Sequence, residues 1–342
     1  MRTEKTYYRL LNLMRAYCAL LIVFIHMGLG NETPFIACVT RQGVPFFFMV
    51  SGFFFSKKLR RSQNVREMTI QYIKPILFVY GMWVLFWLPL TFIEYRRLYP
   101  GSVVQLLAIL VRRIFLAGTV PYWYLLVLAE SAVLLALVAK RPKLGWVLCA
   151  AGLLLSGIYH YETACHINGI VYRLFYTVFS WNNNVIMSGF PLMFLGFAAQ
   201  QQERRLRTLS FWALLALYIL SVVCAFAVLY RFGYAYVFPF GILQAVLLFL
   251  LCLSPVPFQQ ALSDRICEVA RKYSSVLFLS HTVFLSILGK TLNLWNAPLR
   301  YLVSVCSAAL LLLLVDKLNF PLLDKLFMLK RPLPSEYTSS AS

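Results

Sequence analysis

The chain has 342 residues, of which 61% are hydrophobic and only 13% are charged. About a quarter of the residues in soluble domains are charged, so this composition excludes a water-soluble globular protein. The net charge of +20 does not indicate nucleic-acid binding, because the basic residues lie in short segments between apolar runs and not along one helix face.

The apolar runs are about 15 to 25 residues long and do not alternate in polarity, which favours membrane-spanning helices over barrel strands. We therefore predict an all-α, polytopic integral membrane protein with one membrane domain over residues 1–330. Its ten predicted spans are residues 15–30, 35–55, 70–93, 120–139, 144–158, 185–199, 209–230, 234–253, 275–289 and 299–315. Segment 103–116 includes Arg112 and Arg113, and it is predicted to be an interfacial or re-entrant helix.

Ten spans place both ends of the chain on the same side of the membrane. With the ends inside, 23 of the 32 Lys and Arg residues fall in inner segments and 9 in outer ones. Positive charge accumulates on the cytoplasmic side, so both termini, including a polar tail at 331–342, are expected in the cytoplasm and the protein in the plasma membrane. The basic loops are also expected to attract anionic membrane lipids.

The first predicted span has two ionisable residues on one face. Arg15 and His26 are eleven residues apart, which is about three turns and about 16 Å of α-helix. A guanidinium suits phosphate, and an imidazole exchanges a proton near neutral pH, so the pair indicates a catalytic site. The alternative is that Arg15 extends to the interface and His26 makes a structural hydrogen bond.

Further candidates lie in later spans. In the second span, Ser51 and Gly52 follow an aromatic run and are small enough for close helix contact. Asn184, which precedes the sixth span, either donates to a substrate carbonyl or caps the helix. His281 lies in the ninth span. No metal-ligand spacing or Gly-rich phosphate loop is present, so no bound metal or cofactor is expected.

These residues resemble the signature of the acyltransferase 3 superfamily of membrane acyltransferases. The Arg15-x10-His26 pair precedes GVPFFFMVSGF at 43–53, which is similar to the family's G-V-x-x-F-F-x-x-S-G-F. PYWYL at 121–125, FPLMFLG at 190–196 and LSH at 279–281 resemble its W-Y-L, P-L-F-x-x-G and Y-x-x-H segments. The resemblance follows the family order from about residue 10 to residue 315.

Within the superfamily, the chain most resembles the membrane part of the vancomycin-resistance serine racemases. No pyridoxal-phosphate racemase domain follows, so racemisation is not expected, and a separate partner protein could supply a soluble domain. Two sequence patterns of the chain differ from those of these relatives. The family's R-x-x-R is absent around Arg60 and Arg61, and Asn183-Asn184-Val185 replaces the racemases' R-N-G. We expect binding of acyl-CoA or of the acceptor to differ there.

The resemblance implies transfer of an acyl group, usually acetyl, from cytoplasmic acyl-CoA to a hydroxyl of a cell-envelope glycan, lipid or small molecule. His26 would be the general base or a proton relay. The further catalytic candidates are Arg15, Asn184 and His281. The expected residues for binding acyl-CoA are Arg60, Arg61, Lys74 and Ser51. Two alternatives stay open, namely transport of a solute such as L-serine and a catalytically idle membrane scaffold.

Thiol labelling of intact cells tests the predicted orientation. In a cysteine-free background, a cysteine placed beside Arg60 is expected to resist a membrane-impermeant reagent, because that loop has the basic residues of an inner segment. A cysteine placed beside His166, in a predicted outer segment, is expected to react and serves as the control. Labelling beside Arg60 in intact cells would contradict the orientation.

Overall fold

The computed structural model of the protein describes residues 8–27, 34–98, 101–112, 114–115, 122–179, 183–233, 237–258, 261–291 and 296–329. Every regular element within these ranges is a helix, which confirms the predicted all-α class. Pro121, Asn182 and the predicted polar tail at 331–342 lie outside the described residues.

Helices near the N-terminus form the centre of the molecule. They are α2 (Arg9–His26), α4 (Pro34–Thr40) and α5 (Gly43–Arg61). A turn at residues 41–42 separates α4 from α5, but the backbone at Gln42 keeps a helical conformation, so Ile36–Arg61 forms one long apolar segment. The fully buried Gln42 side chain stabilises this turn by donating to the Tyr218 hydroxyl at 2.9 Å. A buried polar side chain at membrane depth needs such a partner, because lipid offers none.

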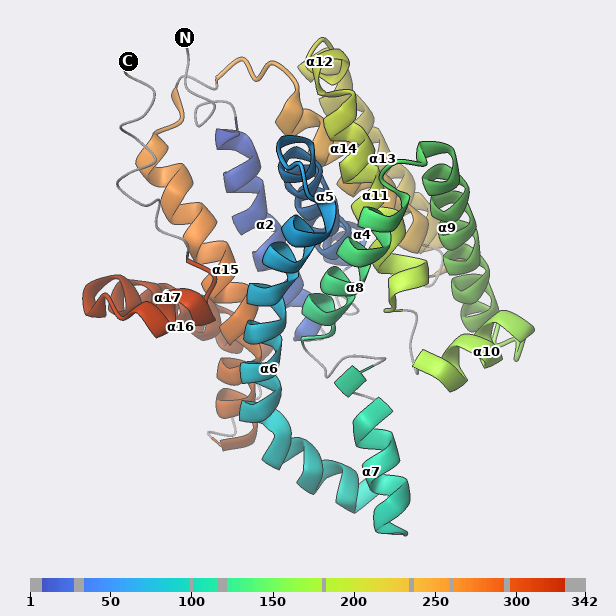
Figure 1. Ribbon diagram of the computed structural model, residues 1–342, viewed down its shortest axis with the longest axis vertical. Helices are drawn as coiled ribbons and strands as arrows, with labels where there is room; N and C mark the ends of the chain where they lie inside the picture. Colours follow the sequence, from blue (N-terminus) through green and yellow to red (C-terminus); the bar gives the residue numbers. More distant parts are fainter. Residues whose placement is uncertain are drawn as a thin grey trace.

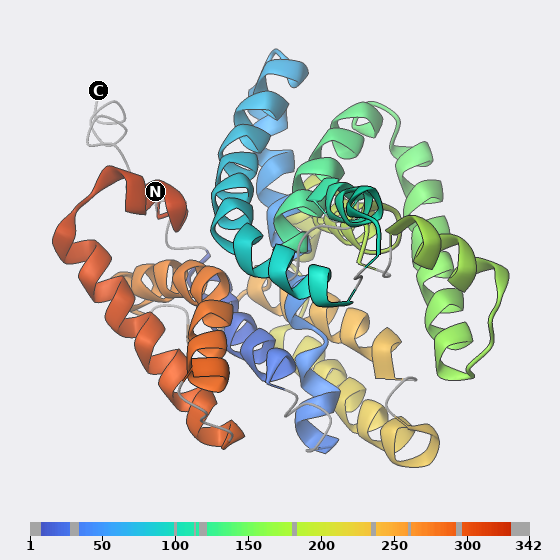
Figure 2. The same cartoon turned by 90° about the horizontal axis from the view of Figure 1, so that it is seen from below.

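The other elements surround this centre (Figure 1). They are α6 (Val65–Leu98), α7 (Val103–Arg112), α8 (Trp123–Val138), α9 (Pro142–Ala164), α10 (Ile170–Phe179), the π-helical turn η2 (Val185–Gly189), α11 (Phe190–Gln201), α12 (Glu203–Leu206), α13 (Phe211–Phe232), α14 (Phe238–Leu253), α15 (Asp264–Ser286), the π-helical turn η5 (Ile287–Thr291), α16 (Ala297–Leu318) and α17 (Pro321–Leu326). Figure 2 shows α15 and α16, in orange and red, on one side of the centre, and α9 and α10, in green, on the opposite side.

Six helices in the described part of the chain are long and apolar enough to cross a membrane. They are Arg9–His26, Ile36–Arg61 (α4 and α5 together), Val65–Arg97, Pro142–Ala164, Phe211–Phe232 and Ala297–Leu318. The other predicted spans correspond to the shorter helices α8, α11 with η2, and α14, and to α15, which begins with charged residues. The structure supports a membrane protein with several spans, and the predicted number of ten is not confirmed.

Several helices differ from their predicted boundaries: the first span is predicted to begin at residue 15, whereas α2 begins at Arg9. Two other regions differ as well. The ninth span is predicted at 275–289, whereas α15 already begins at Asp264. Its charged first half is stabilised by pairing with other helices, as in the Arg9–Asp264 ion pair at 2.7 Å, and apolar patterning does not detect such pairs. The predicted interfacial segment 103–116 contains α7, and Arg112 of α7 donates to the Thr177 carbonyl of α10, a helix absent from the predicted spans, at 2.6 Å.

Helices α5 and α11 approach so closely that each requires a glycine. A Cβ atom at Gly52 would lie 1.9 Å from the Met193 carbonyl oxygen, and one at Gly196 would lie 1.9 Å from the Met49 carbonyl oxygen. The two contacts are reciprocal, so the two backbones touch. Small residues allow membrane helices to pack in this way, and the close contact expected at Gly52 is therefore present.

Replacing Gly196 by alanine is expected to destabilise the protein by about 1–3 kcal/mol, because the added methyl group forces α5 and α11 apart. Gly157→Ala in α9 is the matched control, since nothing lies within 4 Å of a Cβ atom at that position. Thermal unfolding of both variants in detergent measures the difference. Equal melting temperatures would mean that the α5–α11 contact tolerates a side chain.

Candidate active site

Two histidines from different helices meet at the end of α2. The rings of His26 and His281 have centroids 5.0 Å apart and planes inclined by 45°. Helices α2 and α15 pack along each other, and the Arg9–Asp264 ion pair joins them where both begin. Each histidine is a candidate from the sequence alone, and the structure brings them together. We call His26 and His281 the histidine pair.

The hydrogen bonds of His281 define its tautomer. Its side chain is 1% exposed, and Nδ1 lies 3.0 Å from the Leu277 carbonyl oxygen and 2.8 Å from that of Phe278. A carbonyl oxygen only accepts, so neutral His281 has its proton on Nδ1 and a lone pair on Nε2. Nε2 is buried and has no hydrogen-bond partner among the described residues. A buried acceptor beside a second imidazole is suited to receive a hydrogen bond from it.

His26 is the more accessible member of the histidine pair. It is exposed and lies in the last turn of α2. Figure 1 shows α6 and α7 extending beyond the end of α2, so this end is recessed from the outermost helices.

Arg15 belongs to a polar cluster in the other half of α2. Its Nε is buried and has no hydrogen-bond partner in the described part of the chain. Side chains from three other helices lie close enough to act on its charge. They are Tyr72 of α6, Tyr124 of α8, and Glu268 and Arg271 of α15. Together with Ser51, these residues form what we call the arginine cluster.

Ser51 of α5 connects the hydroxyl groups of the arginine cluster. Its Oγ lies 3.2 Å from the Tyr124 hydroxyl, and the Tyr72 hydroxyl is close enough to interact with it. Hydroxyl groups both donate and accept, and a guanidinium donates, so the cluster can bind anionic or carbonyl oxygens. The structure thus brings together Arg15 and Ser51, which the sequence assigns to different roles.

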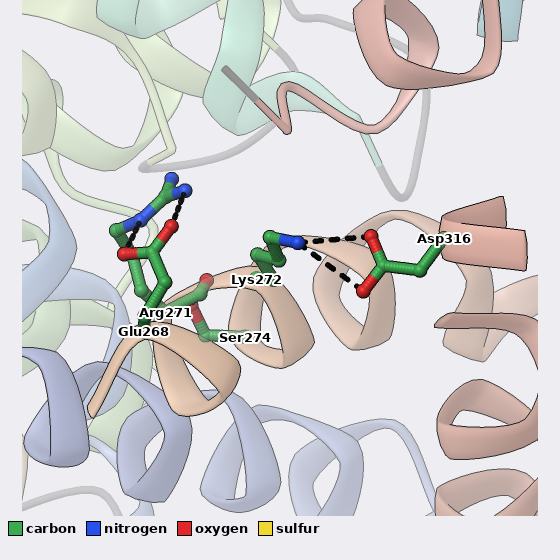
Figure 3. Close-up of polar contacts among 5 residues, drawn as sticks. All are labelled: Glu268, Arg271, Lys272, Ser274 and Asp316. Carbon is green, nitrogen blue, oxygen red and sulfur yellow. Dashed lines mark hydrogen bonds and ion pairs between the residues drawn. The ribbon is translucent and has the colours of Figure 1, made fainter. Parts of the chain in front are cut away.

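The charged side chains of α15 form ion pairs on two sides of the helix (Figure 3). Arg271 forms a two-point ion pair with Glu268, with N–O distances of 2.6 and 3.0 Å. Lys272 pairs on a different side of the helix with Asp316 of α16 at 2.9 Å. The Lys272 pair attaches α16 to α15, whereas the Arg271 pair places a second guanidinium near Arg15. Two guanidinium groups and one carboxylate leave the arginine cluster with excess positive charge.

The basic residues predicted to bind acyl-CoA lie at the surface. Arg60, Arg61 and Lys74 are all exposed. Arg60 follows Ser51 by nine residues on α5, which corresponds to about 14 Å along the helix axis. These three exposed side chains are therefore not part of the arginine cluster.

Lys57 and Lys58 connect that surface with the interior. Lys58 Nζ lies 5.5 Å from the ring centroid of Tyr72, a member of the arginine cluster. Lys57 Nζ lies 3.4 Å from the Tyr8 hydroxyl, which donates to Glu203 at 2.8 Å. Burial, and then the hydrogen bond to Glu203, raise the pKa of Tyr8, so this hydroxyl stays protonated.

Asn184 caps the π-helical turn that precedes α11. It is fully buried, and its Oδ1 accepts from the backbone N–H groups of Ile186 and Met187, both at 3.0 Å. This is the capping role that the sequence left open beside the catalytic one. A catalytic role would depend on the amide nitrogen, because the oxygen already accepts two hydrogen bonds.

Sequence patterns alone do not identify the whole site. Glu268 and Arg271 interrupt the apolar pattern before the predicted ninth span, and those charges are the signal that could have found them. Tyr72 gives no such signal. His160 is expected in an outer loop but lies in α9, where its ring stacks on Phe238 with centroids 3.5 Å apart. No group of His, Cys, Asp or Glu in the described ranges could hold a metal ion.

Replacing Asn184 by serine separates its two candidate roles. Serine is a good helix cap but has no amide, so we expect Asn184→Ser to keep both stability and activity, whereas Asn184→Ala should lose about 1 kcal/mol of stability. Unfolding in detergent and acyl transfer are measured on the same preparations. A stable Asn184→Ser protein with about 10²-fold lower kcat would instead assign the amide to the oxyanion.

The sequence of the chain matches one protein family. The family profile, described as an acyltransferase domain, matches residues 8–316 of the 342-residue chain. No curated protein and no solved structure gives a match. The matched range runs from the start of α2 into the last turn of α16, so it includes the histidine pair and the arginine cluster. The chain therefore belongs to the acyltransferase 3 family.

Proposed function

We propose that this protein is a membrane O-acyltransferase that transfers an acyl group from cytoplasmic acyl-CoA to a hydroxyl group of a cell-envelope acceptor. The proposal rests on the histidine pair, whose rings are 5.0 Å apart at the end of the helix that also contains Arg15. Family membership provides the reaction class, and the histidine pair provides a proton acceptor.

His26 would remove the proton of the acceptor hydroxyl while the hydroxyl oxygen attacks the thioester carbonyl. The new C–O bond forms, the C–S bond breaks, and the proton passes from His26 to the thiolate to give the CoA thiol. Protonated His26 can donate to Nε2 of His281, whose Nδ1–H is bound to its own helix. General base catalysis of this kind contributes about 10²–10⁴ to the rate.

The arginine cluster would hold the donor on the cytoplasmic side of the histidine pair. Its excess positive charge suits the phosphates and carbonyl groups of acyl-CoA. Lys58, 5.5 Å from the Tyr72 ring, extends this positive region toward the surface residues Arg60 and Arg61. Arg15 and His26 are about 16 Å apart along α2, a separation that the extended pantetheine arm of CoA would bridge.

We further propose the acyl group, the acceptor and the location. The acyl group would be acetyl, the acceptor a glycan, lipid or small molecule, and the location the plasma membrane with both termini in the cytoplasm and membrane lipids around the helices. We also propose that the chain is similar to the membrane part of the serine racemases and that a separate partner protein supplies a soluble domain. The family match does not favour the alternative of solute transport.

Replacing His26 by alanine is expected to lower acyl transfer by about 10² or more while leaving the fold and acyl-CoA binding intact, because only the proton acceptor is lost. His281→Ala should also lower transfer, because His26 loses the acceptor beside it. Transfer is measured in inverted membrane vesicles as label incorporated from radiolabelled acetyl-CoA, with thermal unfolding as the test of folding.

His160→Ala is the matched control. His160 is a third helix-borne histidine, stacked on Phe238 in α9 and remote in sequence from the histidine pair. Its replacement should keep transfer within a few-fold of the parent protein. If well-folded His26→Ala protein transfers label at the parent rate, His26 is not the base. If the parent protein transfers no label, the proposed function is wrong.

A further inference from the structure

Three aromatic rings from three helices meet between the arginine cluster and the histidine pair. Phe47 of α5, Tyr124 of α8 and Phe278 of α15 form a triangle. Their ring centroids are 6.4 Å apart for Phe47 and Tyr124, 6.0 Å for Phe47 and Phe278, and 5.3 Å for Tyr124 and Phe278. Aromatic rings at these separations are in contact, so the triangle is closed. We call these residues the aromatic collar.

The aromatic collar contacts the polar groups on both of its sides. On one side, the Tyr124 hydroxyl lies 3.2 Å from Ser51 Oγ and close enough to Arg15 to act on its charge. On the other side, the Phe278 ring centroid lies 6.3 Å from that of His281, and the Phe278 carbonyl accepts from His281 Nδ1. The three rings therefore connect the arginine cluster with the histidine pair, and a thioester that moved directly from one to the other would have to displace them.

Displacing the rings becomes more difficult as the acyl group grows. Phe47 is 9% exposed and Tyr124 6% exposed, so neither ring has open space to enter without disturbing neighbouring side chains. A two-carbon acyl group needs little displacement, whereas each further methylene must find room among closely packed rings. The Phe278 backbone also anchors His281, so this helix turn cannot move without disturbing the histidine pair.

We propose that the aromatic collar of Phe47, Tyr124 and Phe278 is an acyl-length filter that restricts the donor to short-chain acyl-CoA. This inference rests on the proposed function and specifies its donor. Phe47 and Phe278 are the residues to change, because their side chains have no polar group. Tyr124 is unsuitable, because its hydroxyl also belongs to the arginine cluster.

Phe278→Ala is expected to raise the ratio of butyryl to acetyl transfer by about tenfold or more, because the smaller alanine side chain leaves space for the two extra methylene groups of butyrate. Initial rates are measured in inverted vesicles with radiolabelled acetyl-CoA and butyryl-CoA. Phe278→Leu and Phe47→Leu are the second variants, in case alanine prevents folding. Phe249→Ala is the matched control, because Phe249 is 2% exposed and contacts Phe46 and Phe53 but is not part of the aromatic collar.

The outcomes distinguish this inference from the proposed function. A higher ratio in the collar variants, with an unchanged ratio in Phe249→Ala, supports the filter. An unchanged ratio in folded collar variants overturns it, and so does an equal rise in Phe249→Ala, which would indicate general loosening. In both of those cases acetyl transfer by the parent protein leaves the proposed function standing. A parent protein that transfers neither acyl group overturns both.

Discussion

The arrangement of the site depends on the close approach of α5 and α11. Gly52 and Gly196 allow the two backbones to touch, and this contact determines how α5 is rotated about its axis. Because Ser51 and Phe47 belong to the same helix, that rotation directs Ser51 toward the Tyr124 hydroxyl and Phe47 toward Phe278. A glycine in a helix usually weakens it, so two glycines facing one another indicate that proximity matters more here than local helix stability.

A second constraint is the attachment of α15 to its neighbours. Four charged residues in the first half of α15 form three ion pairs. Asp264 binds Arg9 of α2, Arg271 binds Glu268 within the helix, and Lys272 binds Asp316 of α16. The Arg9–Asp264 pair opposes sliding of α15 along α2, and a slide of one turn would move His281 about 5 Å away from His26.

The two constraints together produce a sequence of three zones along α2. The arginine cluster has excess positive charge, the aromatic collar consists of three packed rings, and the histidine pair contains the groups that would exchange protons in the proposed reaction. Tyr124 connects the first two zones, since its hydroxyl contacts Ser51 and its ring contacts Phe278. Phe278 connects the last two, since its carbonyl binds His281. The groups proposed to bind the donor and those proposed to transfer the proton are therefore separated by packed rings, and contacts through Tyr124 and Phe278 connect them.

The sequence by itself determined the class of the protein and the relation of Arg15 to His26. Apolar run length reflects the thickness of the membrane, and the eleven-residue spacing reflects the helical repeat, so both are local properties of the chain. Tertiary structure decided the partner of His26, the start of α15 and the aromatic collar. His281 lies more than 250 residues from His26, and no local pattern specifies which faces of two distant helices will meet. The sequence left open whether Asn184 caps a helix. The structure identified the capping role of its Oδ1, because capping depends on the direction of the backbone N–H groups, which only the folded chain defines.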